Sequence, residues 1–537
     1  MDGLPMGPWF PRDVGFRGTG VDFLGLRAVN MRLIDACLPG ISNVTHSIRP
    51  YSVATWMWWK ACELLSDGDA EGRMSRELRA FAERVETLFA WGHRVRGYRG
   101  APGSRSGPPQ AGAVPLTFAS WKRSAANTSI MAPVRYGPSV KNTNGLGFLQ
   151  ASKGGTFAVT EAGNALAAAL DAELKPLGAY RRLLSGLKPV QGREADALEL
   201  VDAWRVEEAS EGEVAAFRAA FHAPAEIAGT ERRGRRSGTI ELVLHVLRRS
   251  PGPMAVDELR RALADRRLPD GSLFDVPEGL AMVRERWLVM QVRQLQRLTL
   301  EALLTWSEEM MLRRGRRSLE ALRTSLREAI ASSTSASPEA PWRDVLQAAL
   351  AARDGGEAAP EAALFEVWDR LAAALAGGDG DGIIGAALAA CVCVRSAVDG
   401  LLERAAERDG RRSDERIGDG AAADDEIRAA CRLGEAERLS LAHFRDWVAE
   451  RMDAPAAAAA IELLETHVLS RHLAVGVGRF DGERQRLRFT LEEAGLEPLI
   501  GAALVPSVTE DRLAALLSLM VECGYLRRHG DNRLSEV

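Results

Sequence analysis

The sequence lacks acidic side chains over a long internal stretch. No Asp or Glu occurs between Thr87 and Thr160, although the 537-residue chain contains 73 acidic residues. A segment with charge of only one sign raises the local positive potential and attracts polyanions. The stretch therefore predicts nucleic acid as the class of partner. Its basic residues are Arg94, Arg96, Arg99, Arg105, Lys122, Arg123, Arg135, Lys141 and Lys153.

Cysteine is also scarce, and none of the six cysteines belongs to a CxxC pair. This spacing argues against a zinc ribbon and a disulfide framework, and it favours a reducing compartment. The N-terminus has no charged segment followed by an apolar one, so we expect no signal peptide. The longest uncharged apolar run, from Gly382 to Val394, is too short to span a bilayer. We therefore expect a cytoplasmic protein without a membrane segment.

Several catalytic and metal-binding motifs are missing. The patterns GxxxxGK[ST], HExxH and GxSxG do not occur. His467 and His472 are five positions apart, so they do not share a helical face as an i, i+4 metal pair would. The sequence GGDGDG at 377–382 resembles a calcium loop, but Ala390 stands where an EF-hand needs Glu. We predict no catalytic residue, no metal site and no cofactor.

Charge is distributed unevenly along the chain. Residues 1–250 carry 32 basic and 25 acidic side chains, a net charge of +7. The remaining residues carry 37 basic and 48 acidic side chains, a net charge of −11. A basic N-terminal part and an acidic C-terminal part indicate that the two parts have different functions.

Apolar residues recur at helical spacing through most of the chain, with the longest periodic helix at 280–312. Its polar face carries Arg284, Arg293 and Arg297. The pattern predicts a mainly α-helical, multi-domain protein with two winged-helix subdomains and few short strands. The expected segments are an N-terminal helical region at 1–99, a winged-helix-like domain at 115–176, a central helical domain at 177–330, an Ala-rich helical region at 342–408 and a C-terminal helical and winged-helix-like region at 427–537.

The first winged helix is predicted from a run of short elements. Residues 129–144 (SIMAPVRYGPSVKNTN) suggest two short helices with a turn at Gly137-Pro138. The apolar GLGFLQ, the polar turn ASKGG, the extended TFAVT and a helix from Glu161 to Leu174 come next. Helix, turn, helix and hairpin is the order of a winged helix. The helices at 239–249 and 256–265 would begin another such unit, and 509–537 predict a helix and strand pair of the same kind.

A winged helix lays its second helix in the major groove and its wing along the phosphate backbone. The second helix would offer Ser139, Lys141, Asn142 and Asn144 to phosphates and base edges, and the wing would offer Lys153. Arg135 lies just upstream, and Lys122 and Arg123 adjoin Trp121. The predicted nucleic-acid-binding residues, with duplex DNA as the expected ligand, are Lys122, Arg123, Arg135, Ser139, Lys141, Asn142, Asn144 and Lys153.

A tryptophan-rich helix is expected at 51–65, directly after Arg49-Pro50. Such aromatic density is typical of a core anchor, because large aromatic side chains gain most from burial. The alternative is a docking surface for a partner protein. Its predicted contact residues are Arg49, Tyr51, Trp56 and Trp59.

The stretch LGLRAVNMRLIDACLPGISNVTHSIRPYSVATWMWWK resembles the N-terminal part of uncharacterised helical proteins of bacterial anti-phage defence islands. They share an apolar helix, a Leu-Pro-Gly turn, an Arg followed by Tyr-Ser, and a Trp-rich helix. The resemblance implies a defence role beside a partner protein and carries no catalytic residues. We expect a non-catalytic nucleic-acid-binding or adaptor subunit. A pure protein-interaction scaffold and a metal-dependent nuclease with dispersed carboxylates stay open as alternatives.

Overall fold

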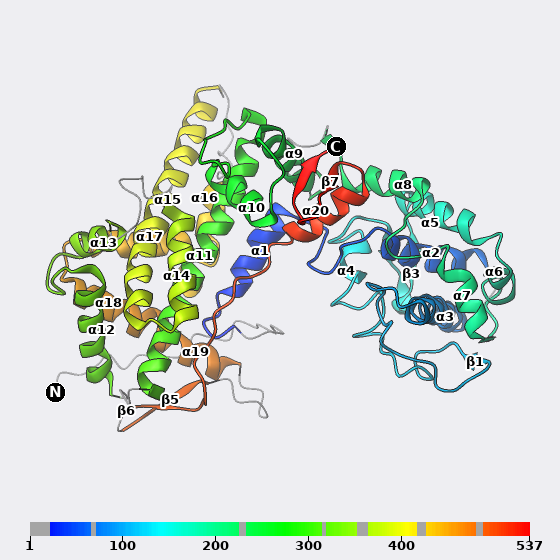
Figure 1. The fold of residues 1–537 in the computed structure, drawn as a ribbon, viewed down its shortest axis with the longest axis horizontal. Helices are drawn as coiled ribbons and strands as arrows, with labels where there is room; N and C mark the ends of the chain where they lie inside the picture. The colour runs from blue at the N-terminus through cyan, green and yellow to red at the C-terminus, as the bar shows by residue number, and fades with distance from the viewer. Residues whose placement is uncertain are drawn as a thin grey trace. The chain divides into compact units, whose positions relative to one another are not determined.

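The computed structural model describes residues 22–65, 71–224, 232–313, 318–351, 363–415, 426–479, 487–493 and 495–537. Helices make up 61% of the chain and strands 7%, so the prediction of a mainly α-helical protein is confirmed (Figure 1). The chain forms two compact units. Unit 1 comprises Met1–Leu33 and Arg284–Thr509, and unit 2 comprises Ile34–Val283 and Glu510–Val537. Both units are discontinuous in sequence, and they cut across the five predicted segments.

Unit 1 is a helical assembly around α15 (Gly380–Glu415). Among the described residues this helix packs against five other helices of the unit. Within the described residues, α15 alone is long and apolar enough to cross a membrane, but 72% of its apolar window is buried inside the protein. That burial is typical of a core helix. The packed helices are α12 (Leu319–Thr334), α13 (Trp342–Ala351), α14 (Leu364–Gly377), α16 (Glu426–Arg432) and α17 (Leu441–Glu450).

The long helix α11 (Glu278–Arg313) confirms the periodic helix predicted from the sequence. The expected solvated polar face is wrong for Arg293 and Arg297, because both side chains are buried. Arg293 donates to the backbone carbonyls of Leu439 and Arg438, and Arg297 pairs with Glu301 at 2.8 Å. Arg293 thus joins α11 to the loop before α17 in unit 1. Unit 1 also contains α18 (Ala456–Glu462), the π-helix η5 (Leu463–Ser470), α19 (Arg471–Gly478) and the strand pair β5 (Phe489–Glu492) and β6 (Gly495–Pro498).

The larger part of unit 2 is built around α2 (Arg49–Glu63) and α3 (Glu71–Arg96). Helix α2 packs against α3 and α5 (Glu161–Leu174), while α3 packs against α7 (Glu194–Val201). Helix α8 (Glu211–Phe221) covers α5. The smaller elements are α4 (Gly137–Val140), α6 (Gly178–Leu183), the antiparallel pair β1 (Val114–Pro115) and β4 (Gln191–Gly192), and the hairpin β2 (Leu149–Ala151) and β3 (Phe157–Val159).

A second subdomain of unit 2 joins segments that are far apart in sequence. Helix α9 (Arg232–Arg249) is followed by the extended residue Met254, which pairs antiparallel with Leu534 of β8 (Leu534–Glu536). The strand β8 also pairs with β7 (Leu526–Arg528). With α10 (Val256–Asp265) and α20 (Leu513–Glu522), the order is helix, a one-residue β-bridge in the place of the first strand, helix, helix, strand, strand. The first strand lies beside the last, which is the arrangement of a winged helix.

Two sequence predictions meet in this subdomain. The sequence suggested two separate winged-helix-like units, one beginning with the helices at 239–249 and 256–265 and the other at 509–537. In the structure these elements belong to one winged helix. In the sequence, residues 284–509, which form most of unit 1, separate the second and third helices of this winged helix. Arg260 joins the two halves through Asp511 at 2.5 Å, and Arg533 does so through Glu258 at 2.5 Å. The basic linker predicted at 230–237 is instead the first turns of α9 from Arg232 onward; 230 and 231 lie outside the described residues.

Candidate nucleic-acid interface

The predicted wing exists as the β2–β3 hairpin of unit 2. Its register pairs Leu149 with Val159 and Ala151 with Phe157. The turn from Ser152 to Thr156 is closed by the Ser152 amide, which donates to the Thr156 carbonyl at 2.9 Å. Two turn residues, Gly154 and Gly155, have φ values of 66° and 72°, which glycine adopts without a steric penalty. The polar sequence ASKGG therefore makes a tight turn that leaves Lys153 exposed at its tip.

Aromatic packing fixes the hairpin to the core of unit 2. The Phe157 ring lies 5.1 Å from the Trp58 ring of α2 in an edge-to-face arrangement. The Lys141 ammonium group lies 5.0 Å from the centroid of the Phe157 ring, so this lysine is held close to the turn of the hairpin. Thr160 caps α5 by accepting a hydrogen bond from the Gly163 amide, and it also donates to the Gly147 carbonyl at 2.7 Å. The hairpin is thus anchored at both ends.

A third cation reaches the hairpin from α3. A Cβ atom added to Gly155 would lie 3.4 Å from Nη2 of Arg79, so the Arg79 guanidinium group lies against the turn. Arg79 and Lys153 are exposed and Lys141 is half-buried. Three separate segments therefore bring positive charge to one hairpin. Arg79 was missed at the sequence level because it precedes the acid-free stretch and has Glu77 and Glu83 as neighbours in sequence.

The two short helices predicted at 129–144 are wrong except for one turn of the second. Within this stretch the structure forms only the four-residue α4, and residues 130–136 and 142–144 are in turns and bends. The buried carboxylate of Glu86 accepts hydrogen bonds from the Ser129 hydroxyl at 2.7 Å and from the Ile130 amide at 2.7 Å. Pro133 cannot donate a helical hydrogen bond. The backbone here is therefore used for tertiary contacts instead of a helix.

The remaining predicted interface residues divide into exposed and buried sets. Lys122, Arg135, Asn142 and Asn144 are exposed and available to a ligand. Ser139 is buried within α4. The Arg123 side chain has 0% exposure, pairs with Glu86 at 3.4 Å and donates to the Thr128 carbonyl at 3.1 Å. Ser139 and Arg123 thus belong to the core, and we remove both from the interface.

The expected partner-docking residues of α2 are mostly inside the protein. Arg49, Tyr51 and Trp56 are buried, and only Trp59 is partly exposed. The Trp56 indole donates to Asp171 at 3.0 Å, and the Tyr51 ring packs among other aromatic rings of unit 2. The helix is therefore a core anchor, and burial removes Arg49, Tyr51 and Trp56 from any docking surface.

Comparison with known proteins adds no relative. No family model, curated protein or solved structure matches this chain. The function must therefore be argued from the geometry of the chain itself.

In the C-terminal winged helix, the helix in the position of a recognition helix has no basic residue. Helix α20, in the position of a recognition helix, has the sequence LAALLSLMVE and buries most of its apolar side chains. Glu522 at its end accepts a hydrogen bond from the Ile48 amide at 2.7 Å, so this helix packs on the segment before α2. The exposed cations of this winged helix lie outside α20 and include Arg248 and Arg249 of α9 and Arg527 and Arg528 of the wing. Helix α20 therefore stabilises unit 2 and leaves the β2–β3 hairpin as the better candidate for ligand contact.

The described residues also lack a metal-binding cluster. No group of three or more His, Cys, Asp or Glu side chains that could hold a metal ion occurs among them. The metal-dependent nuclease considered from the sequence thus gains no support from this part of the chain.

Proposed function

We propose that this protein is a non-catalytic nucleic-acid-binding subunit that grips the phosphate backbone of duplex DNA with its β2–β3 hairpin. The observation that carries the proposal is the convergence of Arg79, Lys141 and Lys153, from three separate segments, on that hairpin. Lysine and arginine side chains of this kind neutralise phosphates and release counterions. The exposed Lys122 and Arg135 supply further positive charge from the acid-free stretch.

The contact would be largely independent of base sequence. Direct readout needs an element that enters the major groove and places side chains against base edges. The predicted second helix is shortened to the four-residue α4 followed by turns, and α20 is apolar and buried. Phosphate contacts position a protein on DNA without carrying sequence information. Binding should therefore depend strongly on salt and weakly on sequence.

An anisotropy titration with a labelled duplex at several salt concentrations tests this proposal. The double substitution Arg79→Glu/Lys153→Glu should weaken binding at low salt by about tenfold or more, because two favourable charges become repulsive. The matched control is Lys175→Glu, an exposed lysine at the end of α5 opposite the end that follows β3. Equal affinities for the wild type, the double variant and the control would sink the proposal.

The biological setting that we propose is a bacterial anti-phage defence system, in which this chain works in the cytoplasm beside a separate effector protein. The support is the resemblance of Leu24 to Lys60 to helical proteins of defence islands. An adaptor role also fits unit 1, which exposes several large apolar side chains over a short stretch. These are Val477, Leu491, Leu499, Val505 and Val508. A pure scaffold would bind its partner but show no salt-dependent affinity for DNA.

A further inference from the structure

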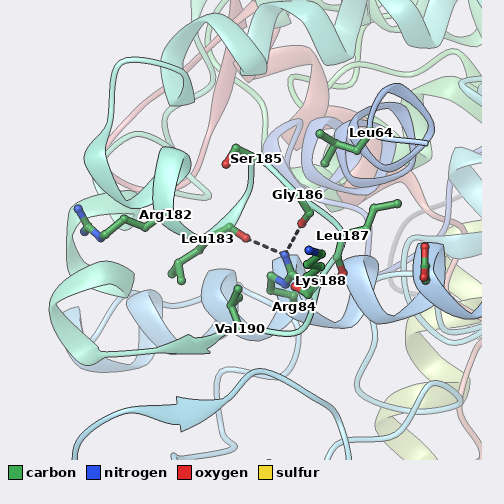
Figure 2. A pocket seen from close by; sticks show the side chains of 10 residues that line it. Leu64, Arg84, Arg182, Leu183, Ser185, Gly186, Leu187, Lys188 and Val190 are labelled. Carbon is green, nitrogen blue, oxygen red and sulfur yellow. Dashed lines mark hydrogen bonds between the residues drawn. The ribbon is translucent and has the colours of Figure 1, made fainter. Parts of the chain in front are cut away.

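Unit 2 contains an open pocket that the hairpin does not use (Figure 2). Its volume is about 410 Å³, within the range of sites that hold small organic ligands. The walls come from the end of α2, one face of α3, α6 and the loop that leads to β4. The lining residues are Leu64, Glu77, Arg84, Arg182, Leu183, Ser185, Gly186, Leu187, Lys188 and Val190.

Arg84 organises the pocket. Its guanidinium group donates to the carbonyls of Leu183 at 2.8 Å, Gly186 at 2.7 Å, Leu187 at 3.0 Å and Lys188 at 2.5 Å. Figure 2 shows it at the centre of the site, with the loop folded around it. The four Nη hydrogens are all donated to these carbonyls, none to a carboxylate, and burial lowers the pKa of the guanidinium group to about 10. The backbone carbonyls orient this charge without neutralising it.

Lys188 adds a second charge beside Arg84. Its side chain is exposed, and its ammonium group makes no hydrogen bond or ion pair with any described residue. Arg182, by contrast, is held by Asp196 at 2.7 Å and by Glu199 at 2.9 Å. Glu77 is the one carboxylate among the lining residues. The pocket therefore has an excess of positive charge, concentrated at Arg84 and Lys188.

The rest of the pocket suits an apolar body. Leu64, Leu183, Leu187 and Val190 supply aliphatic walls around the charged end. Sites of this kind bury most of a small ligand against apolar side chains and fix its orientation with a few polar groups. Lysine serves as a point charge for phosphate in many proteins. A phosphate monoester carries a charge of about −1.5 to −2 near neutral pH, so it is attracted by the positive charge of Arg84 and Lys188, which exceeds that of the single lining carboxylate, Glu77.

We propose that this pocket binds a phosphate monoester attached to an apolar or planar body, with the phosphate on the exposed Lys188 ammonium group, attracted also by the nearby charge of Arg84, and with the body against the four aliphatic side chains. Two sources share this chemistry: a free mononucleotide and the 5′-terminal phosphate of a nucleic-acid strand. The inference does not rest on the hairpin, because none of the residues Arg79, Lys141 and Lys153 lines the pocket.

Calorimetric titration of the full chain with AMP, adenosine and inorganic phosphate tests the site. AMP should bind at least about tenfold more tightly than adenosine, because only AMP carries the phosphate. Lys188→Ala should weaken AMP binding by about tenfold while leaving the Lys188 carbonyl in place for Arg84. The matched control Lys175→Ala, an exposed lysine outside the pocket, should bind AMP like the wild type.

Three results would each overturn the inference. They are equal affinity for AMP and adenosine, equal AMP affinity in the wild type and Lys188→Ala, and no AMP binding at millimolar concentration. Thermal melting of Lys188→Ala provides the folding control. If its melting temperature falls, Lys188→Gln replaces it, because glutamine removes the charge but keeps the side-chain length closer to that of lysine.

The source of the phosphate is settled by a second titration with strands that end in a 5′-phosphate or a 5′-hydroxyl. Tighter binding of the 5′-phosphate strand, lost in Lys188→Ala, assigns the pocket to strand ends. AMP binding without this difference assigns it to free mononucleotides. Repeating the titration with Arg79→Glu/Lys153→Glu separates the two sites, because loss of the hairpin contact should not change the preference for the 5′-phosphate.

Discussion

The Arg49 guanidinium group and the Glu213 carboxylate form a 3.0 Å ion pair whose side chains are only 2% and 0% exposed. Arg49 also donates to the backbone carbonyls of Ala203 and Glu208. Glu213 in turn accepts from the Ser210 amide at 2.9 Å in the capping box of α8. One buried pair therefore connects the start of α2 to the loop before α8 and to that helix.

Removal of one partner of this pair should strongly destabilise unit 2. We expect Arg49→Ala to lower the free energy of unfolding by about 3–5 kcal/mol, because Glu213 would be left buried and unpaired. Urea denaturation followed by circular dichroism measures the loss. The double variant Arg49→Met/Glu213→Leu should recover part of it, since no buried charge remains. A single variant as stable as the wild type would contradict the structural role.

A second buried network predicts different effects for two tryptophans of the same helix. Asp171 accepts hydrogen bonds from the Trp56 indole at 3.0 Å and from the Tyr180 hydroxyl at 2.8 Å. Trp56→Phe keeps an aromatic ring but leaves Asp171 with one donor fewer, which should cost about 1–3 kcal/mol. The partly exposed Trp59 makes no such bond, so Trp59→Phe is the control. Equal unfolding midpoints for the two variants would show that the hydrogen bond from Trp56 to Asp171 does not stabilise the fold.

Glu522 predicts a pH dependence of stability. Burial raises the pKa of its carboxyl group from 4.5 to about 7, while hydrogen bonds from Ile48 and Ser47 and the charge of Arg49 act in the opposite direction. The folded state therefore binds more protons than the unfolded state between about pH 4.5 and pH 7. Stability from this group is present below that window and is lost as the pH rises through it, by up to about 3 kcal/mol.

Comparison of the wild type with Glu522→Gln isolates this contribution. Glutamine can still accept the hydrogen bond from the Ile48 amide, but it does not ionise. The difference in unfolding free energy between the two proteins should change in favour of the variant as the pH rises from about 5 to about 7.5. A difference that is constant over this range would show that Glu522 titrates as in an unfolded chain.

The C-terminal helix tests the closure of the split winged helix. Leu516 of α20 is fully buried, whereas Ala514 on the same helix is exposed. Leu516→Asp should destabilise unit 2 by more than about 3 kcal/mol, because it removes apolar contacts and buries a charge. Ala514→Asp, with the same new side chain, should change the melting temperature little. Similar melting curves for both variants would mean that α20 does not complete the subdomain.

Local sequence patterns predicted secondary-structure elements well where the residues within a segment determine its conformation. The helices predicted at Glu161–Leu174 and Val256–Asp265 have those bounds in the structure, and the ASKGG turn forms the expected hairpin. In each case capping residues, apolar spacing or glycines lie within the segment. These signals need no knowledge of distant contacts.

Sequence reasoning failed where a distant side chain decides the outcome. The acid-free stretch begins at Thr87, and Glu86 directly before it is the residue that neutralises Arg123 and holds the Ile130 backbone. Counting charged residues along the sequence cannot show that the Glu86 carboxylate contacts residues so far downstream. The pairing of Met254 with Leu534, which completes the winged helix, could not be predicted for the same reason. Most of unit 1 lies between these two residues in the sequence.

The hairpin proposal predicts a specific change in salt dependence. Each neutralised phosphate contributes about −0.9 to the slope of log affinity against log salt on duplex DNA. Lys153→Ala and Arg79→Ala should each make the slope shallower by about 0.9, and the double variant by about 1.8, because the two cations contact separate phosphates. Lys175→Ala should leave the slope unchanged. If Lys153→Ala weakens binding with an unchanged slope, the lysine supports the hairpin structure and does not contact phosphate.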